Sequence, residues 1–413
     1  MRCLWITRNH PFAANAGDLI YTARLAQALA DAGGSVTMLC RRSGDDTMAD
    51  AAAPSGIEMR IVDAPMRSKA GAFGTRLPSI AYRFSHGRMR SALRAELRRE
   101  WDAVLIDSVG AGWALPDVLR HRDQSRRRPL LVYISHNHEA SVRAEVARNA
   151  TGLAAVPMRL DAAKVAPLER WLVAAADLVT TNTAEDESTY RLEHPDTSYL
   201  VLVPGYQDRV VTHRDIDGTT PRRAVVLGAF DWIAKRINLE EFVAVADPLF
   251  ATAGAELVVV GRGPREWLDS MRDRTVATRF TGPVDSVVEY LDDARVGIVA
   301  ERSGGGFKHK VLYYVFNRVP VAALDGSVAN MPLEPDRSII YAATVEELAG
   351  RVLALLDDTE GLRRLQVSAF DRCAGLFDWA TRGRNLLARM MMDDAVTEPA
   401  RGPASGSVDE RAR

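Results

Sequence analysis

The chain has 413 residues, of which 47% are hydrophobic and 26% are charged, and its formal net charge is −1. This length and balance predict a soluble globular protein with more than one domain, and the near-zero charge argues against a nucleic-acid partner. The amino-terminal residues are too polar for a signal peptide, and no run of about 18 apolar residues predicts a membrane span, so we expect a cytoplasmic protein. Three cysteines without metal-ligand spacing predict buried thiols: Cys3, Cys40 and Cys373.

Short apolar runs alternate with amphipathic stretches along the first half of the chain. This order predicts parallel strands that are covered by helices on both faces of a sheet. The runs predict strands at residues 3–7, 36–40, 59–62, 103–106, 130–135, 178–181 and 199–203, with helices clearest at 19–32 and 167–176.

The second half repeats this order. Its runs predict strands at residues 224–227, 256–260, 279–281, 296–299, 319–323 and 338–342, with helices at 239–246, 264–272, 284–292 and 345–356. Two such halves predict an α/β protein with two doubly wound, Rossmann-like domains facing a central cleft. We expect these boundaries: an N-terminal domain at 1–205, a polar linker at 206–223, a C-terminal domain at 224–378, a helix at 379–393 that returns to the first domain, and a disordered tail at 394–413.

A glycine-rich turn follows the predicted strand at residues 296–299. Gly304, Gly305 and Gly306 lead into an amphipathic segment, and Lys310 lies about one turn inside the predicted helix. Free backbone N–H groups and the positive dipole at the start of such a helix suit a phosphate, and the lysine adds a full charge. A turn beside a solvated lysine has the same spacing, so both interpretations stay open.

Two other strand ends carry residues suited to an anion. Gly17 precedes the first helix, where a glycine lets a ligand approach the backbone, but no GxGxxG pattern supports a dinucleotide. Gly228 follows a strand, and the next helix opens with Lys235 and Arg236, one of which could reach the same anion as Lys310. The alternatives are a turn without a ligand and a solvated basic turn.

Polar residues close the predicted strand at residues 130–135. His136, Asn137, His138 and Glu139 stand where α/β proteins place ligand contacts. The two histidines lack a third ligand of evident spacing, so a metal site is not favoured. The other alternative is a helix cap made by the asparagine, with solvated histidines.

The order of these motifs resembles a GT-B glycosyltransferase, close to the retaining family 4, which is also called glycosyl transferases group 1. The resemblance covers nearly the whole chain, about residues 2–390. The motifs that carry it are the Gly17 helix with its LAQALADAGGSVTML ending, SHN, AAADLVTTNTAEDES, VPGY, LGAFDW, VVVGRG, FTGPV and SGGGFKHKVLYYVFNRVPVAAL. Each motif is weak alone, but eight in this order are specific.

The resemblance implies transfer of a sugar from a nucleotide-sugar in the C-terminal domain to an acceptor in the N-terminal domain, with retention and without a metal. His136 would approach the donor sugar, while Lys235 and Lys310 would neutralise the diphosphate, so these are the expected catalytic residues. The expected acceptor contacts are Asn137, His138 and Glu139. The expected donor contacts are Gly17, Gly228, Gly261, Gly263, Gly282, Val284, Gly304, Gly305, Gly306, Phe307 and Tyr313. The single DxD motif lies in the predicted linker, so no metal or other cofactor is expected.

The chain departs from the family pattern at three positions, one of which is Arg318, where a glycine is often found two residues before the proline. The family has two glutamates, with seven residues between them, ahead of a Pro-Val pair. Counted back from Pro320, these positions hold Gly305 and Tyr313. A tyrosine offers one hydroxyl in place of a ribose-binding carboxylate, and packing of this ring in the core is the alternative.

These features predict a hexosyltransferase-like enzyme with a carbohydrate or lipid-linked acceptor, acting in surface polysaccharide synthesis. A GT-B protein without catalysis, serving as a binding or scaffolding subunit, is the alternative, and an epimerase of the same fold is a third. The arginine-rich segment from Arg76 to Arg99 contains one acid, Glu96, and predicts peripheral contact with an anionic membrane. A solvated helix face is the alternative for this segment.

Overall fold

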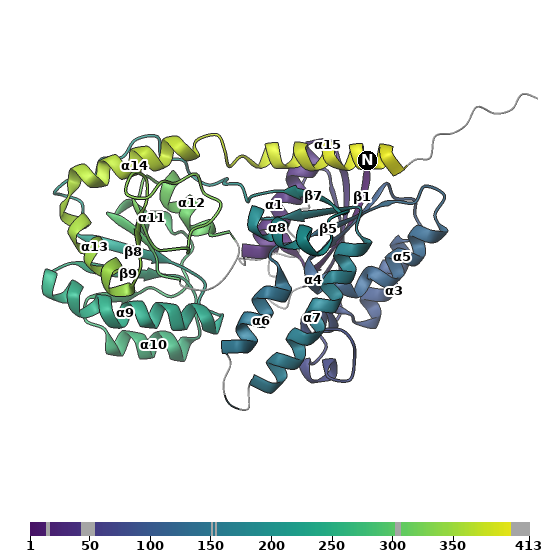
Figure 1. Ribbon diagram of the computed structural model, residues 1–413, viewed down its shortest axis with the longest axis horizontal. Coiled ribbons are helices and arrows are strands. Elements are labelled where there is room, and N and C mark those ends of the chain that lie inside the picture. Colours follow the sequence, from purple (N-terminus) through teal and green to yellow (C-terminus); the bar gives the residue numbers. More distant parts are fainter. Residues whose placement is uncertain (14–16, 43–53, 150–151, 153–154, 302–306, 398–413) are drawn as a thin grey trace, which may run out of the picture.

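The computed structural model of the chain describes residues 1–13, 17–42, 54–149, 152, 155–301 and 307–397. Two lobes lie side by side, and each is built on one sheet (Figure 1). The strands of both sheets pair in parallel, which confirms the α/β class and the two doubly wound units. Within the described ranges, no helix has the length and apolar character needed to cross a membrane.

The sheet of the N-terminal lobe reverses its winding in the middle. Its strands are β1 (Arg2–Asn9), β2 (Ser35–Arg41), β3 (Ile57–Val62), β4 (Ala103–Asp107), β5 (Leu130–Ile134), β6 (Leu178–Thr181) and β7 (Ser198–Val201). Their order across the sheet is β3-β2-β1-β4-β5-β6-β7, so the winding reverses between β1 and β4. Such a reversal leaves a crevice at the carboxyl ends of the two strands.

Alternation of side chains along β1 explains why helices cover both faces of this sheet. Leu4 and Ile6 pack in the core of one face, whereas Cys3 and Trp5 pack in the core of the other. The helices are α1 (Gly17–Asp31), α2 (Ser79–Phe84), α3 (Gly87–Glu96), α4 (Ser108–Ala111), α5 (Leu115–Gln124), α6 (Glu139–Asn149), α7 (Ala155–Ala175) and α8 (Ala184–Glu193), with 3-10 turns η1 (Pro11–Ala13), η2 (Lys69–Ala72) and η3 (Gly112–Ala114). All three cysteines are buried and none forms a disulfide, as predicted.

The sheet of the C-terminal lobe has the same design. Its strands are β8 (Arg223–Leu227), β9 (Glu256–Val260), β10 (Thr278–Phe280), β11 (Val296–Val299), β12 (Val321–Leu324) and β13 (Ile340–Ala342). The order β10-β9-β8-β11-β12-β13 reverses between β8 and β11. The helices are α9 (Ile233–Ala253), α10 (Arg265–Arg274), α11 (Val288–Asp292), α12 (His309–Phe316), α13 (Val345–Asp357) and α14 (Thr359–Cys373).

Tyr314 fixes α12 at the reversal between β8 and β11. Its hydroxyl accepts from the Leu227 backbone N–H at 2.9 Å and donates to the Ile298 carbonyl oxygen at 3.2 Å, so it bridges the two strands. Gly297 makes room for the ring, because a Cβ at that position would lie 2.5 Å from it. The start of α12 is thereby held over the crevice.

Every strand predicted from an apolar run has a counterpart in the sheets, but three predicted helix starts are wrong. The helices predicted at 239–246 and 284–292 begin at Ile233 and Val288, and the third is α7. α7 begins at Ala155, and Pro167, where we predicted the start, lies inside it. A proline inside a helix removes a hydrogen bond and costs about 3 kcal/mol. Packing of α7 on α6 and burial of Val165 and Leu172 in the sheet core offset that cost.

The last helix, α15 (Trp379–Thr397), leaves the C-terminal lobe and packs on α1 of the N-terminal lobe (Figure 1). Leu386 and Met390 are buried in the same core cluster as Leu29. Gly383 lets the two helices touch, because a Cβ there would lie 1.9 Å from the carbonyl oxygen of Ala28. The chain therefore crosses between the lobes twice, once before β8 and once before α15.

We predict that Gly383→Ala destabilises the protein. The added methyl group would overlap a backbone carbonyl and push α15 from α1, at a cost of about 1–3 kcal/mol. Gly350→Ala is the matched control, since a Cβ there meets no atom within 4 Å and alanine favours a helix over glycine by about 0.5–1 kcal/mol. Denaturant unfolding measures both variants, and an unchanged midpoint for Gly383→Ala would contradict the close helix contact.

Candidate active site

Charged side chains collect where β8 and β11 end, on the two sides of the reversal in the second sheet. Lys235 lies in the first turn of α9, which follows β8. Glu301 comes two residues after β11, and Lys308 and Lys310 stand at the start of α12. Because parallel strands end at the same edge, the four side chains meet over the crevice between β8 and β11.

The carboxylate of Glu301 lies at the centre of this group. It is buried, and its two oxygens lie 2.5 Å from Nζ of Lys310 and 3.2 Å from Nζ of Lys308. Burial disfavours the charged form, but the charges of Lys310, Lys308 and Lys235 outweigh it and hold the pKa of Glu301 well below its ordinary value. Three ammonium groups therefore surround one ionised carboxylate.

Lys235, rather than Arg236, faces this group. Burial lowers the pKa of Lys235, while the charge of Glu301 raises it and the charges of Lys310 and Lys308 lower it again. The guanidinium of Arg236 turns back and donates to the carbonyl oxygen of Phe230 at 3.2 Å. Of the two basic residues that the sequence offered, the structure thus brings the lysine to Lys310.

His136 and Asp107 form a buried pair where β5 and β4 end in the other lobe. His136 Nε2 lies 2.5 Å from Asp107 Oδ1, and Oδ2 accepts from the Thr22 hydroxyl at 2.7 Å. Burial disfavours the imidazolium, but the charge and hydrogen bond of Asp107 outweigh it and raise the pKa of His136. Burial also opposes ionisation of Asp107, yet His136 outweighs it and lowers the pKa of that carboxyl. The pair is therefore biased toward an imidazolium beside a carboxylate.

The backbone that carries Asp107 is strained. The next residue, Ser108, has a φ of 65°, a left-handed conformation that costs an L-residue about 1–2 kcal/mol. Its hydroxyl accepts from the Gly110 N–H at 3.2 Å, which stabilises the turn. Strain of this kind is concentrated at functional sites, and here it aims the Asp107 side chain at His136.

The two groups face each other between the lobes. His309 begins α12 and is half-buried, and its pKa lies at about 4 because desolvation, His136 and Lys235 all disfavour its cation. The neutral His309 ring is thus close enough to interact with His136 of one lobe and Lys235 of the other. Gly17 begins α1, and a Cβ there would meet no atom within 4 Å, so the space in front of that glycine is open.

Three of the expected donor contacts lie together where β8, β9 and β10 end. The Gly261 N–H donates to the Gly282 carbonyl at 3.2 Å, and a Cβ at Gly261 would lie 1.7 Å from the carbonyl oxygen of Gly228. With a φ of 141°, Gly261 takes a conformation that only glycine adopts easily. Gly263 instead lies against aromatic rings, and Val284 packs against the core.

The side chains of Phe307 and Tyr313 both contact other parts of the protein. The Phe307 ring is buried in the core of the C-terminal lobe. The ring of Tyr313 packs edge-on to Tyr206 at 5.4 Å, and its hydroxyl donates to Asp208 Oδ2 at 2.5 Å. The alternative of core packing therefore describes the Tyr313 ring, while a linker carboxylate holds its hydroxyl. Three expected donor contacts lie outside the described residues: Gly304, Gly305 and Gly306.

The three expected acceptor contacts turn toward α6 and α8. The His138 ring packs 4.6 Å from the Tyr190 ring, and its Nδ1 accepts from the Ser141 backbone N–H at 3.2 Å. The Asn137 carbonyl oxygen accepts from Tyr190, and the Glu139 carboxylate pairs with an arginine one turn along α6 at 3.2 Å. His138 therefore points away from the Asp107 side of His136.

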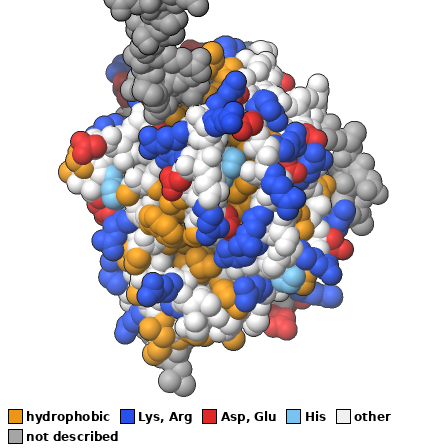
Figure 2. Space-filling view, turned by 90° about the vertical axis from the view of Figure 1, so that its right-hand side faces the viewer, with side chains coloured by type: hydrophobic (Ala, Val, Ile, Leu, Met, Phe, Trp, Pro, Cys, Tyr) orange, Lys and Arg blue, Asp and Glu red, His pale blue; other side chains and the backbone are white. Residues whose placement is uncertain are grey.

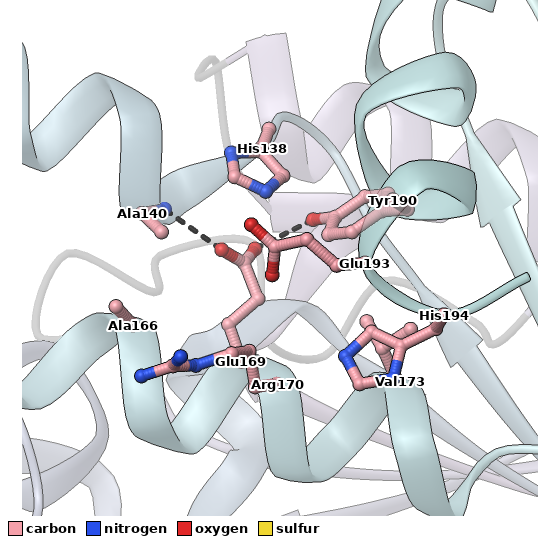
Figure 3. Close-up of a pocket in the computed structure, with 9 residues that line it drawn as sticks. All are labelled: His138, Ala140, Ala166, Glu169, Arg170, Val173, Tyr190, Glu193 and His194. Carbon is pink, nitrogen blue, oxygen red and sulfur yellow. Dashed lines mark hydrogen bonds between the residues drawn. The ribbon is translucent and has the colours of Figure 1, made fainter.

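A cavity of 170 Å³ lies between α6, α7 and α8, with His138 and Glu193 on its lining (Figure 3). Glu169 closes one side, where it accepts from the Ala140 N–H at 2.7 Å and from the Tyr190 hydroxyl at 2.6 Å. Burial raises the pKa of Glu169 to about 7. The N–H groups at the start of α6 are thus capped by Glu169 and His138, not by Asn137.

Three carboxylates of the interlobe region escaped the sequence analysis: Asp107, Asp208 and Glu301. Asp107 ends β4 and Glu301 follows β11, the strands at the two reversals, and this position is the signal that could have found them. Asp208 lies in the irregular linker and has no periodic signal. Each of the three binds a residue that the sequence did single out.

Among the described residues, no group of three His, Cys, Asp or Glu side chains is arranged to hold a metal ion. The DxD motif of the linker shapes a turn, in which Asp217 accepts from the backbone N–H groups of Thr219 and Thr220. Asp215, its other carboxylate, has a side chain that is 71% exposed. It lies 3.1 Å from Nε2 of His213, so both acids of the motif have contacts within the linker.

We predict that Asp107→Asn lowers the pKa of His136. Burial would then act on the imidazolium without an opposing charge, so the ring should lose its proton at a lower pH than in the wild type. Thr22→Val is the matched control, because it removes one hydrogen bond to Asp107 but keeps the charge. Histidine NMR titration measures the shift, and an unchanged His136 titration in Asp107→Asn would contradict the pairing.

Two family models match consecutive parts of the chain. The model described as Glycosyltransferase Family 4 matches residues 20–196, and the model described as Glycosyl transferases group 1 matches residues 221–358. The matches separate at the linker, so each covers one lobe. No curated protein sequence matches the chain.

Solved glycosyltransferase structures share the fold over almost the full length. Sucrose-phosphate synthase from Thermosynechococcus elongatus has a TM-score of 0.71 and 18% identity, over 96% of this chain and 100% of that chain. HepE from Anabaena in complex with UDP-glucose has a TM-score of 0.65 and 12% identity, over 95% and 100%. WaaG, a glycosyltransferase involved in lipopolysaccharide biosynthesis, has a TM-score of 0.63 and 14% identity, over 97% and 100%. Identities this low show the fold alone, but together with the family matches to both lobes they place the chain in the group 1 family of GT-B glycosyltransferases.

Proposed function

We propose that the chain transfers a sugar from a nucleotide-sugar to a carbohydrate or lipid-linked acceptor, with retention at the anomeric carbon and without a metal. The observation that carries this proposal is the cluster of Lys235, Lys308 and Lys310 at the crevice between β8 and β11. Lysine ammonium groups can neutralise a diphosphate in place of a divalent cation. The UDP-glucose complex of HepE supports a nucleotide-sugar donor for this fold.

The donor lies in the C-terminal lobe, with its diphosphate on the lysine cluster. The glycines that end β8, β9 and β10 bring their backbones together on one side of this crevice, and the nucleobase is proposed to lie near Gly228, Gly261 and Gly282. This places the donor sugar toward the opposite lobe, where His136 stands. A protonated His136 can donate a hydrogen bond to a sugar hydroxyl while Asp107 fixes the orientation of the ring.

Retention follows from which group can accept the proton of the acceptor hydroxyl. Asp107 and Glu301 are both engaged by cations, so neither is a good general base. The leaving phosphate oxygen is then the base. As the bond from the anomeric carbon to the phosphate oxygen breaks, the acceptor oxygen bonds the anomeric carbon from the same face, and its proton passes to that phosphate oxygen. Lys235 and Lys310 stabilise the charge that develops on the diphosphate.

The end of the N-terminal lobe formed by α3 and α5 is rich in basic side chains (Figure 2). Arg94, Arg98, Arg120 and residues 126–128 are exposed there. Asp117 pairs with Arg94 at 3.1 Å and with Arg120 at 2.9 Å, so part of the charge is compensated. We propose that the remaining charge docks the enzyme on an anionic membrane at its cytoplasmic face, where a lipid-linked acceptor is available.

Lys310→Ala should lose about ten- to hundredfold in affinity for UDP, because it removes a charge-assisted contact to the diphosphate. Lys69→Ala, which removes an exposed lysine of η2, is the control and should bind UDP as the wild type does. Calorimetric titration with UDP in buffer with EDTA measures the affinities and tests metal independence at the same time. Equal affinity in Lys310→Ala and wild type would show that the diphosphate binds elsewhere, and binding that needs Mg²⁺ or Mn²⁺ would contradict the metal-free clamp.

Membrane docking predicts that the wild type co-sediments with vesicles of phosphatidylglycerol and phosphatidylcholine at low salt. Substitution of both Arg98 and Arg127 by glutamate should release most of the bound protein from the vesicles, since each basic residue near the membrane surface contributes about 1 kcal/mol. The control reverses two exposed arginines of the other lobe, Arg265 and Arg363. Equal sedimentation of the two double variants would show that this face does not contact lipid.

A further inference from the structure

Glu301 is the one member of the lysine cluster with a negative charge, and no expectation from the sequence included it. The carboxylate is buried two residues after β11, and both oxygens are in contact with lysines of the α12 start. Lys235 approaches from α9, on the other side of the reversal. Glu301 is therefore where the two elements that flank the crevice meet.

Among the described residues, the charges of this cluster leave a surplus. Three ammonium groups and one carboxylate give two positive charges in excess. The other basic groups that reach Lys235 do not change this sum. Arg262 is paired with Asp231 at 2.6 Å, and His309 has a pKa of about 4 and is neutral at physiological pH. A nucleotide-sugar carries one negative charge on each phosphate of its diphosphate, so the surplus matches it.

We propose that Glu301 is a positioning residue of the donor site, which gathers Lys235, Lys308 and Lys310 into one cradle whose surplus charge is matched to a diphosphate. The inference rests on the proposed donor site, and it adds the residue that organises the site. Glu301 does not touch the donor, because its oxygens are occupied by the lysines that do. Its role is to hold those lysines together before the donor arrives.

A carboxylate performs two tasks here that a neutral side chain cannot. Ammonium groups crowded in a buried place repel one another, and the negative charge offsets this repulsion. It also keeps the half-buried Lys235 protonated, since the charge of Glu301 opposes the effect of desolvation on the pKa of that lysine. Without the carboxylate, Lys235 should lose its proton at a lower pH, and the cradle should lose affinity for a diphosphate with it.

The pH dependence of UDP binding tests this role. Titrations of wild type, Glu301→Gln and Glu301→Asp with UDP run from about pH 7 to about pH 9.5, where the phosphates of UDP are already ionised. In Glu301→Gln, the decline of affinity with rising pH should begin about one pH unit lower than in wild type. In Glu301→Asp, the charge is kept on a shorter side chain, so the wild-type pH dependence should return with an affinity reduced at every pH.

If Glu301 had only a structural role, both variants should have lower thermal stability, and their UDP affinity should depend on pH as it does in the wild type. That result, or the same displaced decline in Glu301→Asp and Glu301→Gln, would overturn the proposal. Wild-type binding of UDP, GDP or dTDP is measured first, and a wild type that binds none of them overturns the proposed function and this inference together. A wild type that binds UDP, with a Glu301→Gln variant that titrates identically, overturns the inference only.

Lys308→Met keeps the proposal testable if the Glu301 variants do not fold. It removes one ammonium group and lowers the surplus from two charges to one, while leaving the Glu301–Lys310 pair in place. The preference for UDP-glucose over uridine should then fall about tenfold, because one of the two phosphate charges loses its counter-charge. An unchanged preference would contradict the matching of charge to a diphosphate.

Discussion

The candidate site depends on one constraint, which is that all strands of a parallel sheet have their carboxyl ends at the same edge. Two such sheets with a reversal in each place two crevices in the protein, one between β1 and β4 and one between β8 and β11. Asp107 stands at the first, and Lys235 and Glu301 stand at the second. His309 interacts electrostatically with groups from both. The chemistry is thus assembled from residues far apart in sequence by the common direction of the strands.

Packing between the lobes connects the two halves of this assembly. Trp379 of α15 lies with its ring 5.6 Å from Tyr21, and Tyr21 packs against His136 at 5.3 Å, so the helix that returns from the C-terminal lobe supports the histidine. The linker makes a second connection, since Asp208 accepts from Tyr313 of α12. In both contacts, a side chain from a segment that crosses between the lobes touches a residue beside the candidate site. The geometry between His136 and the lysine cluster therefore depends on the two crossings as well as on the sheets.

Hydrophobic periodicity was enough to predict the strands and the two-lobed α/β class, because apolar runs report burial directly. The family was predicted instead from the resemblance of eight motifs in the same order. The strand-to-helix turns also predicted that Lys235 or Arg236 approaches Lys310, and the structure brings Lys235 there. Glu301 was missed because a single acid between a strand and a glycine run has no pattern, and its role appears only when three lysines converge on it. His138 was grouped with His136 because the two residues are close in sequence. Side chains in a loop share no fixed direction, however, and the fold turns His136 toward Asp107 and His138 toward Tyr190.

We propose that the donor diphosphate binds at the lysine cluster between β8 and β11. A crystal structure of the chain with bound UDP tests it most directly. We expect both phosphates to lie within hydrogen-bond distance of the ammonium groups of Lys235, in α9, and Lys310, in α12. Glu301 should remain buried behind these lysines. A diphosphate bound away from the β8–β11 crevice, or a bound UDP that leaves these lysines in contact with Glu301 alone, would contradict it.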